Sequence, residues 1–585
     1  MNIARFSYLF LSIIVIFGFG LRVYNLDKHG IFLDEKATIL ISQGMAMEGN
    51  SQKNCFYTLG KNTFTPREFW APKTIEDFYD SIRRSDIGNS PFYYLILHNW
   101  IKAFGMSDFS IRFLSVLFSC SIIILLFFFI KEHFQNVKLA LLACFLMAIE
   151  PFFIAISQQT RNYSMSFFLT LLVTHIFLKI IKNEEKEKKS LKLYWIYGIL
   201  SALCLLSHFL TAVVFMVHGL YVLLFVRKSR PWFLLPTFLM IGALAFGYWI
   251  FFGGGDYTFK TLDYQAKLYY KEARLVPNPH AGYIDPATLP NVTKKSIPIF
   301  TDLFIISNNV LSNTVGKKNI LMAICIALIS IFSLAKFQKI SKKHWIWLIL
   351  GINVIGFFFY STAKWQYLEI VNCGMLLYLF IQHWRNTQEK IAKKQLWFLL
   401  FLTLIPTLFL IVMTFKSGHT FGLTQRYSGF SFPYSIIFVS IALLNANFSI
   451  KPLNYAIWAV FVVQLWFIGL TVRTVLNDES LKYNYRSKAR AENPYPKIAA
   501  ELVKQYQTGD TIVYPSFTKE YYQEDRYVSN IKRSVLDAQY VNLYLPKDAD
   551  YVQTIDVQEL DKVILRKRDG RKIVVFDLKG ELFRY

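Results

Sequence analysis

The chain begins with MNIARFSYLFLSIIVIFGFGLRVY (residues 1–24), in which Arg5 precedes a long apolar stretch. The stretch exceeds the roughly 7–15 residues of a signal-peptide core, and no A-x-A-like cleavage site follows it. We therefore expect an uncleaved first transmembrane helix. Further runs of about 17–22 apolar residues, a length that crosses roughly 30 Å of hydrocarbon, recur along the chain. The sequence thus predicts a polytopic membrane protein.

Thirteen apolar runs predict thirteen transmembrane helices. They lie at about 4–24, 111–130, 138–156, 162–181, 192–208, 210–226, 231–252, 319–335, 345–361, 367–383, 396–415, 433–446 and 455–472. The fifth and sixth meet at SHFLT, where we expect a break. Another apolar segment, 90–105, is short and contains His98 and Lys102, so we expect a helix along the membrane surface.

Lys and Arg in the short loops predict the orientation, because cytoplasmic loops carry the excess of positive charge. One set of loops contains KNEEKEKKSLK (182–192), RKSR (227–230), KFQKISKK (336–343) and RNTQEKIAKK (385–394). The opposite set holds only Arg161, Lys364, Lys416 and Arg426. We therefore expect a cytoplasmic N-terminus and an extracytoplasmic C-terminus, with the chain in the cytoplasmic (inner) membrane.

This topology divides the chain into two domains. Residues 1–472 form the transmembrane domain, with outer loops 25–110 and 253–318, and residues 473–585 form an extracytoplasmic domain. In the tail, strand-like runs alternate with a helical stretch, KIAAELVKQY (497–506). The runs are DTIVYPS (510–516), YVNLYLP (540–546) and KIVVFDL (572–578). The expected fold is an all-α polytopic membrane protein with a small α/β C-terminal domain.

Composition removes several classes of function. The net charge of +25 sits largely in short loops, so membrane orientation explains it without a nucleic-acid partner. The six cysteines show no CxxC or metal-ligand spacing, and we expect neither a disulfide framework nor a zinc site. No Gly-rich phosphate loop is present, which disfavours a nucleotide-dependent pump or kinase.

The first candidate site is GIFLDEK (30–36), which follows the first span and places Asp34 beside Glu35. A partly desolvated carboxylate at a membrane surface suits a proton acceptor. Adjacent helical residues point about 100° apart, so we expect Glu35 to orient Asp34 or a neighbouring cation. The alternative is that Asp34 is a helix N-cap.

Three further motifs lie on the same predicted outer face. They are SQQTRNYSM (157–165) with Arg161, SHF (207–209) with His208, and FGLTQRYSGFSFP (421–433) with Arg426 and Tyr427. Each has a structural alternative: a snorkelling or anchoring arginine in the two longer motifs, and a structural histidine in the short one. Together, outer carboxylates and outer arginines suggest chemistry on a lipid-borne phosphate, which arginine binds with a planar fork of donors.

The order of these motifs resembles the membrane glycosyltransferases of the protein O-mannosyltransferase and aminoarabinose-transferase superfamily, which share the GT-C fold. The resemblance covers residues 1–225 well and 416–445 loosely. The matching stretches are HGIFLDEKATILIS, NSPFYYLILHNWIKAFGMSDFSIRFLSVLF, AIEPFFIAISQQTRNYSM, WIYGILSALCLLSHF and QRYSGFSFPYSIIF.

The resemblance implies an active site at the outer membrane surface. The enzyme would move a sugar, with inversion, from a polyprenyl-phosphate (undecaprenyl-phosphate) donor to a lipid, protein or polysaccharide acceptor. Asp34 would be the catalytic aspartate, and Glu35 would be the second acidic residue of the pair. The family positions for donor phosphate or substrate binding are Arg112, Arg161, Tyr163, His208, Arg426 and Tyr427.

Two departures leave the substrates open. Gln159 stands where the family has a glutamate, so that position lacks its acid. Two alternatives follow: Glu150, which is close in sequence, replaces this acid, or the site works without it. Ser90 precedes Pro91 where aminoarabinose transferases have a lysine, so neither that sugar nor lipid A is implied.

Two other functions fit the sequence less well than a transferase does. A transporter or flippase for a lipid-linked saccharide would place ionisable or broken segments near mid-membrane, whereas this chain gathers them at one face. A structural scaffold would not need the paired acids. A divalent cation held by Asp34 or Glu35 stays an alternative to metal-free catalysis.

Overall fold

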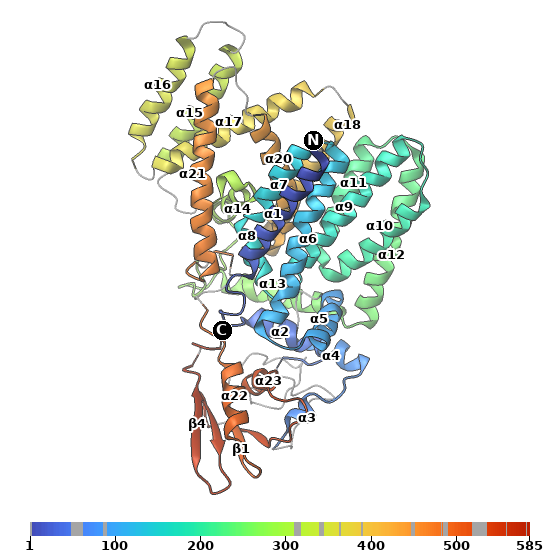
Figure 1. The fold of residues 1–585 in the computed structure, drawn as a ribbon, viewed down its shortest axis with the longest axis vertical. Coiled ribbons are helices and arrows are strands. Elements are labelled where there is room, and N and C mark those ends of the chain that lie inside the picture. Colours follow the sequence, from blue (N-terminus) through green and yellow to red (C-terminus); the bar gives the residue numbers. More distant parts are fainter. Residues whose placement is uncertain are drawn as a thin grey trace.

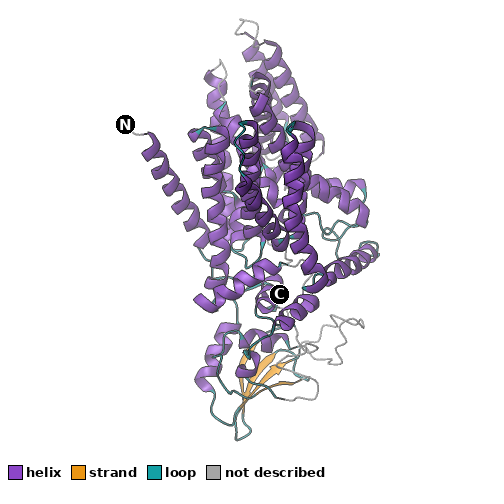
Figure 2. Ribbon diagram, turned by 90° about the vertical axis from the view of Figure 1, so that its right-hand side faces the viewer, coloured by secondary structure: helices purple, strands orange, loops and turns teal. Residues whose placement is uncertain are grey.

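The computed structural model consists of a helical bundle with a small sheet-containing domain at one end (Figures 1 and 2). It describes residues 3–47, 63–85, 90–308, 317–337, 344–361, 364–387, 390–445, 451–480, 482–483, 490–516, 535–556, 558–580 and 582–584. The predicted fold class, a helical membrane protein with a small α/β C-terminal domain, is confirmed.

Each of the thirteen predicted spans falls on a helix or on a pair of helices. These are α1 (Ile3–Val23), α6 (Asp108–Phe134), α7 (Val137–Ala148) with α8 (Pro151–Ser157), α9 (Tyr163–Glu185), α10 (Leu191–Ser207), α11 (Ala212–Phe225), α12 (Ser229–Phe252), α15 (Lys317–Phe337), α16 (His344–Phe359), α17 (Lys364–Asn386), α18 (Lys390–Ser417), α20 (Phe432–Leu444) and α21 (Lys451–Leu476). The break expected at SHFLT is present, because a short 3₁₀ turn, Phe209–Thr211, separates α10 from α11.

Length and hydropathy single out fewer of these helices as membrane spans. Among the described residues, seven helices are long and apolar enough, or eight if α7 and α8 count as one bent span. Four shorter apolar helices, in the α10, α11, α15 and α16 regions, fall below that length. The count of thirteen spans therefore stays a prediction.

The third predicted span is bent rather than straight. Helices α7 and α8 meet at an angle of 57°. The cause is local, because Pro151 is the first residue of α8 and its ring lacks the N–H that a continuous helix would need. Glu150 caps α8, and its Oε1 accepts a hydrogen bond from Phe152 N at 3.4 Å.

The helices of the bundle differ in how far their surfaces are covered. In the apolar segments of these helices, 89% of the residues around α20 and 72% of those in α9 are buried, against 22% in α1 and in α12. Apolar side chains on the less covered helices face outward, as expected for contact with lipid tails. The bundle thus has central helices surrounded by helices that present an apolar perimeter.

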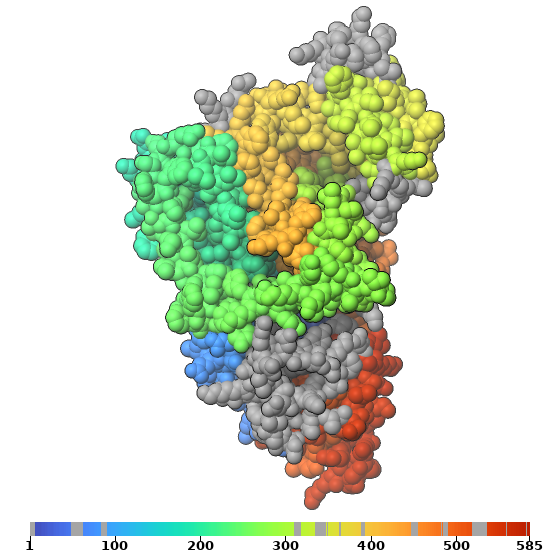
Figure 3. Space-filling model, turned by 180° about the vertical axis from the view of Figure 1, so that it is seen from behind, coloured from blue at the N-terminus to red at the C-terminus, as the bar shows by residue number. Residues whose placement is uncertain are grey.

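Shorter helices lie between the bundle and the C-terminal domain. They are α2 (Leu33–Ser42), α3 (Pro66–Phe69), α4 (Ile75–Ser85), α5 (Pro91–Phe104), α13 (Asp256–Glu272), α14 (Leu289–Leu303) and α19 (Gln425–Ser428). Helix α5 matches the short helix expected at 90–105. Seen from behind, α13 crosses the molecule between the bundle and the C-terminal domain, whereas α14 lies beside the bundle helices α18 and α20 (Figure 3, green).

The C-terminal domain packs helices against a four-stranded sheet. Its elements are α22 (Tyr495–Gln505), β1 (Thr511–Pro515), α23 (Leu536–Asn542), β2 (Gln553–Asp556), β3 (Lys562–Arg566) and β4 (Lys572–Asp577). The strand order is β2-β1-β3-β4, with β1 and β2 parallel and the other pairs antiparallel. The domain therefore mixes a parallel crossover with an antiparallel hairpin.

The structure confirms the helix predicted at 497–506 and the strands predicted at 510–516 and 572–578. The strand predicted at 540–546 is wrong, because its first residues end helix α23. Tyr540, Val541 and Asn542 are all buried, and a short segment covered on every side shows no period that separates helix from strand. Strands β2 and β3 were not predicted.

The C-terminal domain directly contacts the segment between α2 and α4. The backbones of Phe64 and Gln553 exchange two hydrogen bonds, of 3.0 and 2.9 Å. Trp70 Nε1 donates to the carbonyl of Asn542 at 3.0 Å. Residues almost five hundred positions apart are thereby joined in one structural unit, which requires both segments to be on the same side of the membrane.

The loop charges predict the outcome of reporter fusions. Fusions after residues 186 and 390 should report a cytoplasmic location, and a fusion after residue 475 an external one, because the positively charged loops stay inside. The measurement is the activity of reporters that work on only one side of the membrane. A cytoplasmic result at residue 475 would contradict the proposed orientation of the C-terminal domain.

Candidate functional site

Asp34 lies in the first turn of α2, with its side chain 40% exposed. The helix begins at Leu33, so Phe32 occupies the N-cap position and the N-cap alternative for Asp34 is wrong. Asp34 forms an ion pair with Arg426, whose Nη1 lies 3.5 Å from Asp34 Oδ2. Asp34 is therefore a carboxylate that is reachable from outside and lies beside a guanidinium.

Glu35 points the other way and is completely buried. Its two oxygens accept hydrogen bonds from Arg112 Nε and Nη2, each at 2.9 Å. Thr160 N donates to Oε1 at 2.8 Å, and Phe32 N donates to Oε2 at 3.2 Å. Four donors thus use the acceptor positions of this carboxylate, which carries no remaining capacity for a substrate proton.

The pKa of Glu35 follows from these contacts. Burial acts to raise it, but the charge and hydrogen bonds of Arg112 outweigh burial, and with Thr160 they lower the pKa to about 2. The carboxylate is therefore ionised at any physiological pH. A permanently ionised, fully bonded acid is suited to holding structure rather than to exchanging protons.

Arg112 uses all five of its N–H donors inside the protein. Besides the two bonds to Glu35, its Nη1 donates to the carbonyls of Leu26 and His29, and its Nη2 donates to that of Gly30. The distances are 2.7–2.9 Å. The resemblance predicts that this arginine binds the donor phosphate, but these contacts use all of its donors.

Arg161 holds the helix that carries Asp34. Its Nη1 donates to the Asp34 carbonyl at 3.1 Å and to Thr38 Oγ1 at 2.6 Å. The guanidinium lies 5.8 Å from the ring centre of Tyr163. The turn that presents Arg161 also presents Thr160 to Glu35, so one segment between α8 and α9 contacts both acids of the pair.

Arg426 approaches Asp34 from the other side, on the short helix α19. It is buried, and its guanidinium lies 4.9 Å from the ring centre of Tyr427. The ring of His208 lies 5.8 Å from that of Tyr163 and 6.1 Å from that of Tyr427. His208 Nδ1 accepts a hydrogen bond from Leu210 N at 3.2 Å, which caps the turn that follows.

The structure therefore brings six of the eight predicted residues together around one carboxylate. They are Asp34, Arg161, Tyr163, His208, Arg426 and Tyr427. We call this set the Asp34 cluster. The other two, Glu35 and Arg112, form the buried pair behind it. The roles of all eight in substrate binding or catalysis stay predictions.

Sequence reasoning missed several neighbours of the cluster. Thr38 follows Asp34 by one helical turn, a spacing that signals contact on the same helix face. Tyr283 comes from the connection between α13 and α14. Burial raises its pKa, Arg426 lowers it and Asp34 raises it, which places this ring close to both charges. No motif in the sequence pointed to Tyr283.

Lys36 was also missed, and it joins α2 to the C-terminal domain. Its ammonium lies 5.0 Å from the ring centre of Tyr495 and 4.6 Å from that of Tyr540. Burial lowers its pKa to about 8. Two aromatic faces around a buried lysine form a cation–π contact whose strength grows with desolvation.

Glu150 belongs to a different polar cluster. Its Oε1 contacts Asn308 Nδ2 at 3.4 Å, and Asn308 Oδ1 accepts from Lys482 Nζ at 2.9 Å. Gln159 donates to the carbonyl of Tyr483 at 3.4 Å. Both residues therefore support the start of the C-terminal segment, and neither is among the contacts of Asp34 described above.

A metal site would need several ligand side chains grouped together. Within the described parts of the chain, no three His, Cys, Asp or Glu side chains are grouped so that they could hold a metal ion.

Comparison with known families supports the resemblance found from the motifs. Residues 89–251 match the family described as dolichyl-phosphate-mannose-protein mannosyltransferase. No curated protein sequence matches the chain. The match and the helical membrane fold agree with the resemblance to membrane glycosyltransferases.

Solved structures of two membrane glycosyltransferases are similar to the chain. The apo oligosaccharyltransferase of Archaeoglobus fulgidus is 14% identical, with a TM-score of 0.39 over 86% of this chain, which spans 58% of that protein. ArnT from Cupriavidus metallidurans is 11% identical in its apo state, with a TM-score of 0.39 over 92% of this chain and 85% of that one. The structure of the same ArnT bound to undecaprenyl phosphate is also 11% identical, with a TM-score of 0.36 over 93% of this chain and 86% of that one. Likenesses at this level carry no argument about activity or site residues.

Breaking the buried pair should destabilise the protein. Glu35→Gln leaves the Arg112 charge buried without its counter-ion, and we expect a loss of about 3–5 kcal/mol in the free energy of unfolding. Glu492→Gln is the control, because it removes an ion pair with Lys497 in which both side chains are 63% exposed. That change should cost less than about 1 kcal/mol. Denaturant unfolding in detergent measures both.

The same pair predicts how stability depends on pH. The folded pKa of Glu35 lies below its ordinary value of 4.5, so its stabilisation is complete above pH 4.5 and is lost as the pH falls toward 2. The Glu35→Gln variant lacks this contribution and should show a shallower acid destabilisation. Equal stability of the variant and the parent at neutral pH would contradict the assigned role.

Proposed function

We propose that the chain is an inverting glycosyltransferase that uses a polyprenyl-phosphate sugar at the outer face of the cytoplasmic membrane. The observation that carries the proposal is the Asp34 cluster: a partly exposed carboxylate with Arg426 at 3.5 Å and Arg161 on its backbone. The match of residues 89–251 to a sugar-transferring membrane family supports the reaction class. The direction of the short-loop charges supports the outer face.

In this proposal Asp34 is the general base. It accepts the proton of the acceptor hydroxyl or amine while that atom forms a bond to the anomeric carbon of the sugar. The bond between the anomeric carbon and the phosphate oxygen breaks on the opposite side, so the configuration inverts. Polyprenyl phosphate leaves with the bonding electrons, and no nucleotide takes part.

Arg426 and Arg161 stabilise the departing phosphate. Charge develops on the phosphate oxygens as the bond breaks, and guanidinium groups fixed in advance reduce the energy of that state. Arg426 is held by its position against Tyr427 and beside Asp34, so little reorganisation is needed. The polyprenyl chain would stay among the apolar helices.

Glu35 and Arg112 serve as positioning residues. Glu35 is adjacent to Asp34 and is tied to α6 through Arg112 and to the α8–α9 turn through Thr160. Movement of this pair would move Asp34, although neither side chain has a free group for the substrate. The two adjacent acids have different roles in this proposal because Asp34 is partly exposed and Glu35 is buried.

The second candidate function is transport of a lipid-linked saccharide. Purified protein should release polyprenyl phosphate from a polyprenyl-phosphate sugar when an acceptor is added, without nucleotide, if it is a transferase. Translocation of intact donor across a vesicle without cleavage would favour the transporter. Comparing the glycans of cells that lack the protein with those of normal cells would identify the acceptor.

The arginines can be tested by donor binding. Arg426→Ala and Arg161→Ala each remove a charge-assisted contact, and at least one should weaken donor affinity by about 1.5–3 kcal/mol. Arg426→Lys should restore only part of it, because lysine lacks the planar fork. Arg473→Ala is the control, an exposed arginine at the last turn of α21. Unchanged affinity in both test variants would reject the phosphate contact.

Asp34→Asn separates catalysis from structure. The change keeps the size of the side chain but removes the proton acceptor, and a positioned base contributes about 10²–10⁴-fold to the rate. We therefore expect normal folding and donor binding with turnover reduced at least about a hundredfold. Asp27→Asn, at an exposed position seven residues earlier, is the matched control. Normal turnover by folded Asp34→Asn protein would place the base elsewhere.

A further inference from the structure

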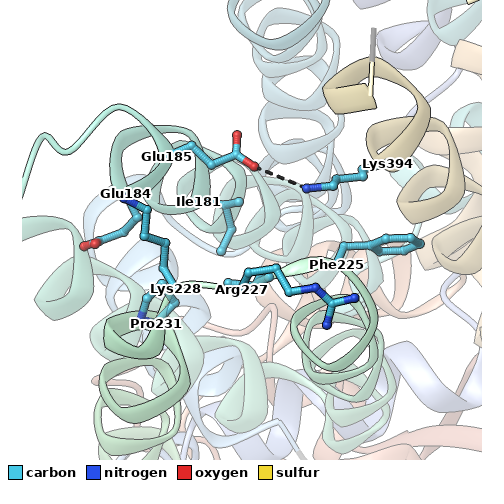
Figure 4. A pocket seen from close by; sticks show the side chains of 9 residues that line it. Ile181, Glu184, Glu185, Phe225, Arg227, Lys228, Pro231 and Lys394 are labelled. Carbon is cyan, nitrogen blue, oxygen red and sulfur yellow. Dashed lines mark ion pairs between the residues drawn. The ribbon is translucent and has the colours of Figure 1, made fainter. Parts of the chain in front are cut away.

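A second polar site lies at the far end of the bundle from the Asp34 cluster. A cavity of about 180 Å³ opens there between the last turn of α9, the connection from α11 to α12 and the first turn of α18. Figure 4 shows the Glu185–Lys394 pair on one side of it and Arg227 on the other, with Phe225 nearby. We call this the α9–α18 cavity.

The cavity lies where three candidate membrane spans end. Tyr163–Glu185 finishes at it, Ser229–Phe252 begins next to it and Ala392–Ser417 begins next to it. The ends of spans mark the level of lipid headgroups. Helix α9 has 23 residues, so the cavity is about 33 Å from the Asp34 cluster at a rise of 1.5 Å per residue. It therefore lies at the opposite membrane surface, which the loop charges predict to be cytoplasmic.

The charges around the cavity are arranged so that one cation is left over. Glu185 pairs with Lys394 at 3.7 Å, and Glu184 pairs with Arg230 at 2.9 Å. Lys228 pairs with Glu187 at 3.1 Å. Each nearby acid is thus neutralised by its own cation.

Arg227 is the remaining charge. It is exposed, lines the cavity and forms no ion pair or hydrogen bond with the described residues. Among the residues that the structure describes, the ammonium of Lys394 opposite it has one ion pair, a long contact to Glu185. A phosphate group between them would find a planar fork on one side and a point charge on the other.

The walls of the cavity are apolar. Ile181, Phe225, Val226 and Pro231 line it beside the charged groups. A free phosphate ion would gain nothing from these side chains, whereas a phospholipid places its phosphate and the start of its acyl chains at this level together. Basic pockets between membrane helices at the cytoplasmic side commonly hold anionic headgroups.

We propose that the α9–α18 cavity binds the phosphate headgroup of an anionic phospholipid of the cytoplasmic leaflet, with Arg227 as the main contact. The lipid would be a structural partner, separate from the polyprenyl-phosphate donor. It would also fill the gap between α9 and α18, the helices that lead to Arg161 and Arg426 respectively at their other ends.

The proposal is tested by lipid retention. The full chain is exchanged into detergent with a mixture of phosphatidylglycerol and phosphatidylcholine, and bound lipid is counted by native mass spectrometry. We expect retention of phosphatidylglycerol over phosphatidylcholine, reduced about fivefold by Arg227→Gln, which corresponds to about 1 kcal/mol for one basic residue. Arg385→Gln is the matched control, an exposed arginine at the last turn of α17 that does not line the cavity.

Three results would overturn the proposal. Equal retention of phosphatidylglycerol by Arg227→Gln and the parent would show that the arginine is not the contact. Equal retention of both lipids would show that the apolar walls alone bind. Displacement of the lipid by millimolar inorganic phosphate would indicate a site for free phosphate. Because Arg227 is exposed, the variant should fold normally, which its unchanged thermal unfolding would confirm.

Discussion

The ion pair between Glu35 and Arg112 is the constraint on which the end of the bundle next to the C-terminal domain depends. Arg112 donates to three carbonyls of the chain that leads from α1 to α2, and Glu35 accepts from the α8–α9 turn. Three segments thus meet at one buried contact. Burying two charges is costly unless every donor and acceptor is satisfied, and here the hydrogen bonds of both groups are complete.

Three successive residues of α2 have three different environments. Asp34 faces the open side beside Arg426, Glu35 faces inward to Arg112, and Lys36 faces the aromatic rings of Tyr495 and Tyr540. Consecutive residues of a helix point about 100° apart, so one turn contacts the site, the bundle and the C-terminal domain. The position of Asp34 is therefore fixed from two sides by its immediate neighbours.

The C-terminal domain stabilises this arrangement through a second buried contact. Tyr544 Oη donates to Asp108 Oδ1 at 2.6 Å, and Asn493 Nδ2 donates to both oxygens of Asp108. Asp108 opens α6, the helix that carries Arg112 one turn later. A domain distant in sequence thus contacts both helices that form the central ion pair, which explains how a part without a predicted catalytic residue contributes to the geometry of the site.

Apolar run length predicted where the bundle helices lie, because crossing a bilayer requires a fixed number of apolar residues whatever surrounds them. The motifs also singled out Asp34, Arg161 and Arg426, which the structure brings together in one cluster. The sequence did not show the bend at Glu150, the helix at Leu536–Asn542, the inward role of Arg112 or the presence of Tyr283. These features depend on which distant segments pack together. Burial removed the periodicity that separates helix from strand in the C-terminal domain. Only the folded chain decides which of two adjacent carboxylates meets an arginine in the interior and which remains partly exposed.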